Sequence, residues 1–210
     1  MKCIIDYNMG NVKSVYNAFR LLGEEVKITN NIQEIRDCES IILPGVGAFS
    51  DGMNNLEKLG LVSVLTEEVI DNKKPYFGIC LGLEFLANHS FEGGETKGFG
   101  WVDAEILPIE PQNNIEKVPH MGWNETQILK NDGLLKDFNE AIFYYLHSYY
   151  MKVNTNEQEK ISSICDYGGV KIVSSIEKDN IYAVQFHPEK SQENGLKLIK
   201  NFLDQENAET

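Results

Sequence analysis

A cysteine held between two glycines is the stretch of this sequence best suited to chemistry. Residues 78–82 read G-I-C-L-G and follow an apolar run. If a strand turns sharply into a helix at Cys80, the thiol rises above the carboxyl edge of a sheet, and the small residues Gly78 and Gly82 prevent clashes at the turn. The pattern indicates a nucleophile elbow. A buried cysteine that only packs at a strand–helix junction is the alternative.

The residues that follow Cys80 could support a negative charge there. We expect a helix over residues 81–88, whose N-terminus beneath the thiol would favour the thiolate. The backbone N–H of Leu81 could also donate to the oxyanion that develops when the sulfur attacks a carbonyl carbon.

A histidine near the end of the chain could act as the base. His187 lies in Q-F-H-P-E-K-S, residues 185–191. Pro188 restricts it to extended backbone, in which alternate side chains point the same way. Glu189 can then accept the ring N–H and fix the tautomer, which completes a triad with Cys80. The other histidines are weaker candidates for the base: His89, His120 and His147.

A glycine-rich loop could complete an oxyanion hole. Residues 43–49 read L-P-G-V-G-A-F and follow another predicted strand. The loop should therefore lie at the same carboxyl edge, where ligands of such sheets bind. Backbone N–H groups of Val46 or Gly47 could act together with that of Leu81. The G-K-[ST] ending of a phosphate loop is absent, and a tight strand–helix turn is the alternative.

The elements that would position these residues alternate through the first half of the chain. The expected strands cover residues 2–6, 25–29, 40–43 and 76–79, and the expected helices cover 12–22, 56–70 and 81–88. Strands that alternate with helices predict an α/β fold with a mainly parallel central sheet flanked by helices.

The second half predicts antiparallel strands added to that sheet. Short strand-like runs separated by turns cover residues 101–107, 126–129, 141–146, 161–166, 170–176 and 181–186. A closing helix is expected over residues 195–203, and the polar residues 204–210 are expected to fray. We interpret residues 1–210 as a single domain.

Composition excludes several classes of protein. The 210 residues carry a net charge of −13, from 32 acidic and 19 basic residues, and no basic stripe that would indicate a nucleic-acid binder. No run approaches the ~18 apolar residues of a membrane span, and Asp6 comes too early for a signal peptide. The four cysteines form no C-x-x-C pair. We therefore expect a cytoplasmic protein without a metal or an organic cofactor, and without nucleic-acid or membrane partners.

Taken together, these stretches resemble the class I, or triad, glutamine amidotransferases. The resemblance is closer still to the HisH family, the glutaminase subunit of imidazole glycerol phosphate synthase. It rests on further blocks that occur in the order of that family and span nearly the whole chain: Asp6-Tyr7 with Met9-Gly10-Asn11, K-V-P-H-M-G-W-N at 117–124, H-S-Y-Y at 147–150 and F-H-P-E-K-S at 186–191.

The resemblance implies a reaction. Cys80 would attack the side-chain amide carbon of glutamine, and His187, oriented by Glu189, would manage the protons while ammonia leaves. Water would then hydrolyse the thioester to glutamate. The resemblance places the oxyanion donors at Leu81 and at Val46 or Gly47, and places substrate contacts at Glu84, Ser148 and Tyr149.

The resemblance also implies a partner. In this family, ammonia passes through a tunnel to a (β/α)8-barrel cyclase, the HisF-like subunit of a heterodimer. That subunit makes imidazole glycerol phosphate and an aminoimidazole carboxamide ribotide in histidine biosynthesis. Positions near that interface match Asn11, Trp123, Tyr144 or Tyr145, and Lys190, although core packing is an alternative for Trp123 and the tyrosines.

Two residues depart from the family. Asn8 stands where glycine is more usual, but asparagine tolerates a left-handed turn. Glu84 stands where glutamine is usual; a carboxylate lacks the two amide donors and brings negative charge about one helical turn from the thiolate. We expect Glu84 to pair with the substrate ammonium group, or to be held by a basic or protonated partner.

Two other functions remain open. A paralogous amidotransferase subunit would supply ammonia for amidation of a surface-polysaccharide or sugar-nucleotide precursor. A non-catalytic subunit would only bind and activate its partner, although the presence of Cys80, His187 and Glu189 argues against it.

Overall fold

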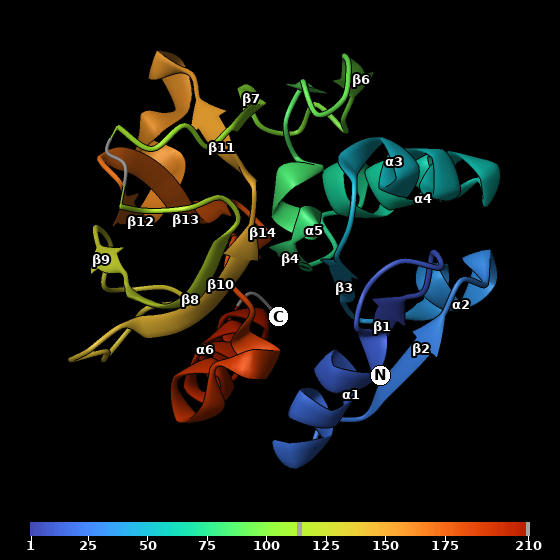
Figure 1. The fold of residues 1–210 in the computed structure, drawn as a ribbon. Coiled ribbons are helices and arrows are strands. Elements are labelled where there is room, and N and C mark those ends of the chain that lie inside the picture. The colour runs from blue at the N-terminus through green and yellow to red at the C-terminus, as the bar shows by residue number, and fades with distance from the viewer. Residues whose placement is uncertain (113–114, 209–210) are drawn as a thin grey trace.

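A twisted sheet runs through the centre of the molecule (Figure 1). The computed structural model describes the chain except for residues 113–114 and 209–210. In that described part, the central sheet has eight strands in the order β2-β1-β3-β4-β14-β13-β12-β9. The neighbours from β2 to β14 pair in parallel, and the rest are antiparallel. The strand bounds are β1 Lys2–Ile5, β2 Val26–Thr29, β3 Ile41–Gly45, β4 Tyr76–Cys80, β9 Gln127–Ile128, β12 Ile161–Tyr167, β13 Val170–Lys178 and β14 Ile181–Val184.

Helices cover both faces of the parallel part of this sheet. The bounds are α1 Val12–Leu21, α2 Ile32–Asp37, α3 Phe49–Lys58, α4 Leu61–Thr66, α5 Leu81–Glu84 and α6 Gln192–Ala208, with a π-helical turn over Glu67–Asp71. One buried cluster joins α1 and α6 to the sheet through Phe19 and Phe202. The other joins α3 and α4 through Leu56 and Leu65. None of the helices within the described residues has both the length and the apolar character that crossing a bilayer requires.

Two small sheets lie beside the central one. In one, β8 His120–Glu125 pairs with β10 Ile142–His147. In the other, the order is β11-β7-β5-β6, with bounds β5 His89–Ser90, β6 Thr96–Lys97, β7 Ala104–Pro108 and β11 Tyr149–Val153. Short 3-10 turns cover Thr155–Lys160 and Pro188–Lys190.

The predicted fold class is confirmed, with corrections to individual elements. The helix expected over 56–70 is interrupted at Gly60, which has a left-handed backbone, and a separate helix already begins at Phe49. Five elements of the structure are not predicted from the sequence: α2, β5, β6, β8 and β11. Of the expected antiparallel strands, those near 101–107 and 141–146 belong to the small sheets and not to the central one.

Two expected helix ends also differ. The helix expected over 81–88 ends at Glu84, because the backbone beyond it bonds to the region of β7: Asn88 N–H donates to Ala104 O and Val102 N–H donates to Leu86 O, each at 2.9 Å. The last residues were expected to fray, but α6 continues to Ala208, and Lys2 Nζ lies 3.0 Å from a carboxylate oxygen of Glu206. Residues 209–210 of that stretch lie outside the described residues.

Candidate active site

Cys80 sits on a strained turn at the end of β4. Its φ and ψ are 54° and −105°, a conformation that residues with a Cβ rarely adopt. A Cβ added at Gly82 would lie 1.9 Å from Leu43 O, and one at Gly78 would lie 2.6 Å from Gly82 O. The prediction that small residues must flank this turn is therefore confirmed.

Strand register brings the separate parts of the site together. Gly45 at the end of β3 pairs with Cys80, and Val184 at the end of β14 pairs with Ile79. Since β3, β4 and β14 are adjacent and parallel, the segments that follow them leave the sheet at one edge. That edge carries the glycine-rich loop, the cysteine and the stretch that leads to His187.

His187 is oriented by Glu189. Its Nδ1 lies 2.9 Å from Oε1 of Glu189, and both side chains are almost completely buried. Because an ionised carboxylate only accepts, Nδ1 is the donor, and Nε2 is the nitrogen that can exchange a proton with Cys80. His187 has extended backbone as predicted, but Glu189 lies in the 3-10 turn and not in an extended segment. The turn brings the carboxylate back to the ring.

The environment of His187 favours its protonated form. Burial opposes the charge most strongly, but the charge of Cys80 and the carboxylate of Glu189 together raise the pKa of His187 to about 10. The main chain is also held in place, because His187 N–H donates to Tyr144 O at 2.8 Å and the Ser191 hydroxyl donates to His187 O at 2.6 Å. At neutral pH the ring therefore carries a proton that can be given to a leaving group.

A cavity of about 330 Å³ opens beside Cys80. Its volume lies at the lower end of the range for small-molecule sites. The residues predicted for the oxyanion hole and for substrate contacts all line it: Val46, Gly47, Leu81, Glu84, Ser148 and Tyr149. The structure thus places the residues predicted for the oxyanion hole and for substrate contacts around one cavity with Cys80.

The loop after β3 and the start of α5 both line this cavity. Gly47 has a φ of +109°, and a Cβ there would lie 2.9 Å from Cε of Met9. Leu81 is the first residue of α5. Because α5 has four residues and not the eight expected, its dipole gives the thiolate less support than predicted. The donors that could hold an oxyanion are therefore individual N–H groups at Leu81, Val46 and Gly47.

Glu84 is buried in the wall of the cavity, with 5% of its surface exposed. Its Oε1 accepts a hydrogen bond from Nε2 of Gln185 at 2.9 Å. Burial raises the pKa of Glu84 to about 8, although the bond from Gln185 lowers it, and the charge of Glu92 adds to the increase. Of the two expectations for Glu84, the basic or protonated partner is replaced by a neutral amide, and pairing with the substrate ammonium group stays a prediction.

Comparison with known proteins gives the family. Residues 3–205 match the family described as glutamine amidotransferase class-I. The chain belongs to the class-I glutamine amidotransferases. Among its relatives, imidazole glycerol phosphate synthase subunit HisH 1 of Campylobacter jejuni subsp. jejuni serotype O:23/36 (strain 81-176) is 43% identical over 203 residues, 96% of this chain and 98% of the relative. Subunit HisH of Aquifex aeolicus (strain VF5) is 44% identical over 200 residues, 95% and 94% of the two chains.

Solved structures show the same fold at low identity. A crystal structure described as a glutamine amidotransferase superposes with a TM-score of 0.75 at 15% identity and covers 98% of each chain. A structure of PurLQS from Thermotoga maritima superposes with a TM-score of 0.73 at 18% identity and covers 97% of each chain. The mixed α/β architecture of this amidotransferase is therefore that of its family.

Two further histidines form a buried pair behind the active site of this amidotransferase. His147, which lines the cavity, places Nδ1 2.7 Å from Tyr149 O and Nε2 2.9 Å from Nδ1 of His120. Because the carbonyl only accepts, Nδ1 of His147 is the donor, and the pair is fully bonded with both rings neutral. Burial lowers the pKa of His120 to about 4 and that of His147 to about 3. Neither ring is a candidate for the base.

Some of the side chains predicted for the interface lie together at the surface, whereas others have a structural role within the fold. Trp123 is 49% exposed and contacts the Tyr144 ring edge to face, with 6.0 Å between centroids; Lys190 Nζ lies 5.8 Å from the centre of the same ring. Tyr145 is buried and bonds to Thr126 and Ser174, so Tyr144 is the tyrosine at the surface. Asn11 caps α1 by accepting from the N–H of Ser14 at 3.4 Å.

Other residues at the site were not predicted. They are Glu92, Pro119, Leu146 and His147 in the cavity wall, and Gln185 beside Cys80. Gln185 carried a signal, because it directly precedes F-H-P-E and follows the strand next to the cysteine. Glu92 carried none, since it follows the short strand β5 in a loop and reaches the site by accepting from the N–H of Phe49 at 2.6 Å.

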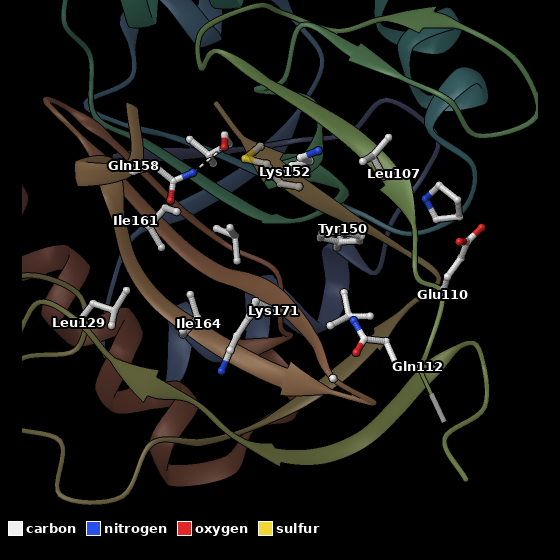
Figure 2. Close-up of a pocket in the computed structure, with 16 residues that line it drawn as sticks. Leu107, Glu110, Gln112, Leu129, Tyr150, Lys152, Gln158, Ile161, Ile164 and Lys171 are labelled. Atoms are coloured by element: carbon white, nitrogen blue, oxygen red, sulfur yellow. Dashed lines mark hydrogen bonds between the residues drawn. The ribbon is translucent and has the colours of Figure 1, made fainter. Parts of the chain in front are cut away.

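A larger hollow of about 900 Å³ lies away from the cysteine (Figure 2). Side chains of β7, β11, β12 and β13 line it, with Tyr150 and Ile164 among the apolar ones and Lys152 and Lys171 among the charged ones. It contains none of the predicted catalytic or substrate-binding residues. The smaller cavity at Cys80 is therefore the candidate active site.

Proposed function

We propose that this chain is the glutaminase subunit of an imidazole glycerol phosphate synthase, which hydrolyses glutamine to glutamate and ammonia during histidine biosynthesis. The observation that carries the proposal is the placement of Cys80 on a strained elbow, next to a histidine oriented by a carboxylate, at the wall of a cavity of suitable size. The relatives named HisH, about as long as this chain and more than 40% identical, support the pathway.

The geometry suggests how the reaction proceeds. Sulfur of Cys80 attacks the side-chain amide carbon of glutamine, and the oxyanion receives N–H groups from Leu81 and from Val46 or Gly47. His187 gives its proton to the departing ammonia while Glu189 stabilises the ring. In the second step His187 takes a proton from water, which attacks the thioester, and glutamate leaves with the thiol restored.

We propose a HisF-like (β/α)8-barrel cyclase as the partner in a heterodimer. Pro119 lines the cavity, and its neighbours Val118, Met121 and Trp123 are 43%, 61% and 49% exposed. Exposed apolar side chains this close in sequence to a residue that lines the cavity are suited to a protein interface. A docked barrel would cover the site and receive the ammonia. The four buried free cysteines fit a reducing, cytoplasmic location.

Co-purification with the native partner tests the proposal. The complex should release glutamate from glutamine and transfer the ammonia to the histidine-pathway acceptor, and Cys80→Ala should abolish both activities. Transfer to a sugar acceptor alone would favour the paralogous function. An intact complex that releases no glutamate with any acceptor present would favour a non-catalytic subunit.

A further inference from the structure

The side-chain amide of Gln185 lies between Glu84 and Cys80. Its Nε2 is 2.9 Å from Oε1 of Glu84 and 3.8 Å from Sγ of Cys80. All three side chains are buried. An amide nitrogen carries two N–H groups, so this single nitrogen can donate to both acceptors at once.

The main chain around this contact is fixed by the sheet. The pairing of Val184 with Ile79 places the next residues of the two segments, Gln185 and Cys80, at the same level. The backbone N–H of Gln185 also donates to Ser174 O on the adjacent strand β13 at 2.9 Å. The position of the amide is therefore set, and what remains to be decided is which end of it faces the sulfur.

Glu84 decides this orientation. An ionised carboxylate can only accept a hydrogen bond, and a neutral carboxyl group still presents one accepting oxygen. Either form can accept from Gln185, and in the structure it is the amide nitrogen that lies 2.9 Å from Oε1 of Glu84 and 3.8 Å from the sulfur. In the opposite orientation the amide oxygen would face the sulfur and repel a thiolate.

We propose that Gln185 is a positioning residue for the nucleophile: it directs an N–H group at Sγ of Cys80, and Glu84 fixes the orientation of that amide. The inference rests on the proposed nucleophilic role of Cys80. It also accounts for Glu84 where the family usually has glutamine, because both side chains supply an oxygen that can accept from Gln185.

Alkylation by iodoacetamide tests the proposal without glutamine or a partner subunit. The rate at Cys80, followed by mass spectrometry of its peptide, reports how well the protein supports the thiolate. Gln185→Met should lower this rate at neutral pH by about threefold to tenfold, since the lost hydrogen bond contributes about 1 kcal/mol. Glu84→Met should lower it similarly. The matched control Glu84→Gln keeps an accepting oxygen and should stay within about twofold of wild type.

The outcomes separate the parts of the proposal. A Gln185→Met rate equal to that of wild type overturns it. A reduced rate in Gln185→Met with no change in Glu84→Met overturns the role of Glu84. If Gln185→Met does not fold, Gln185→Asn gives the same comparison, because it keeps the amide but withdraws it by one methylene.

Glutamate release by the wild-type complex is measured separately. A complex that releases no glutamate but shows the expected alkylation differences would refute the proposed glutaminase function and leave the positioning role supported. If the wild-type complex releases glutamate but all variants are alkylated at equal rates, the glutaminase function is supported and the positioning role is refuted.

Discussion

The imidazole rings of His120 and His147 face each other across the paired strands β8 and β10, with Nδ1 of the first 2.9 Å from Nε2 of the second. The chain of donors runs in one direction, from His120 to His147 and on to the carbonyl of Tyr149. A proton added to His147 would place two N–H groups against each other. The hydrogen bonds as the structure has them therefore require both rings to be neutral.

This pair predicts a loss of stability in acid. Burial holds the pKa values of His120 and His147 near 4 and 3 in the folded protein, below the ~6.5 of an unfolded chain. Their contribution is therefore present above about pH 6.5 and is lost as the pH falls, because the unfolded state binds protons first. Replacing both by asparagine should reduce the proton uptake on unfolding near pH 5 by about two, measured as the slope of unfolding free energy against pH. An unchanged slope would contradict the neutral pair.

Glu84 predicts the opposite dependence. Its pKa is raised to about 8 in the folded protein, against ~4.3 unfolded, so its contribution is complete below about pH 4 and is lost as the pH rises through 8. Glu84→Gln removes the ionisation. The variant should match wild type near pH 4 and exceed its unfolding free energy by on the order of 2–4 kcal/mol near pH 9. Thermal unfolding of both proteins across this pH range checks the sign of the difference in unfolding free energy. Curves of stability against pH that run parallel for the two proteins would rule out a buried ionisable Glu84.

The parts of the site that lie close together in sequence could be predicted from it. The elbow around Cys80 depends on glycines two residues away, and the orienting carboxylate is two residues from His187. In both cases the residues that act together are two positions apart in the sequence, so a single turn of backbone brings them together. The catalytic roles of these residues stay predictions, whereas the need for small residues at positions 78 and 82 is confirmed.

The parts that depend on distant contacts could not be predicted. Gln185 bonds to Glu84, 101 residues away, only because of the register between β14 and β4. The helix after Cys80 looked long enough in sequence, yet tertiary bonds to β7 end it at Glu84. The strand β8 was missed because M-G-W-N, residues 121–124, contains no β-branched residue and includes glycine and asparagine, which are depleted in strands.

The crowding at the elbow predicts a steric penalty. A Cβ at Gly82 would meet the main-chain oxygen of Leu43, so Gly82→Ala should destabilise the fold by about 3 kcal/mol or more. Gly60→Ala is the matched control: φ there is +68°, but a Cβ would meet nothing within 4 Å. That change should cost only about 1 kcal/mol. Denaturant unfolding of both variants measures the difference, and equal losses would mean that the turn at Cys80 has room.

The exposed apolar side chains around Pro119 predict where a partner binds. Trp123→Ala should weaken binding of the proposed cyclase partner by about 10-fold to 100-fold, because exposed aromatic side chains often dominate interfaces. Leu21 is 76% exposed on α1 and does not line the cavity, and Leu21→Ala should leave affinity unchanged. Titration of the purified subunits measures both. A Trp123→Ala protein that binds as tightly as wild type would place the interface elsewhere.

The bond between His187 and Glu189 predicts the behaviour of Glu189→Gln. The amide has nearly the shape of the carboxylate, but its nitrogen could donate to Nδ1, which would leave the proton on Nε2 and give the wrong tautomer for accepting a proton from Cys80. The variant also lacks one of the charges that raise the pKa of His187. Glutamine hydrolysis by the complex should therefore fall at least about 100-fold in kcat, with KM much less affected. Since Glu189 lies behind the ring and does not line the cavity, a change confined to KM would show that it contacts substrate and does not orient the base.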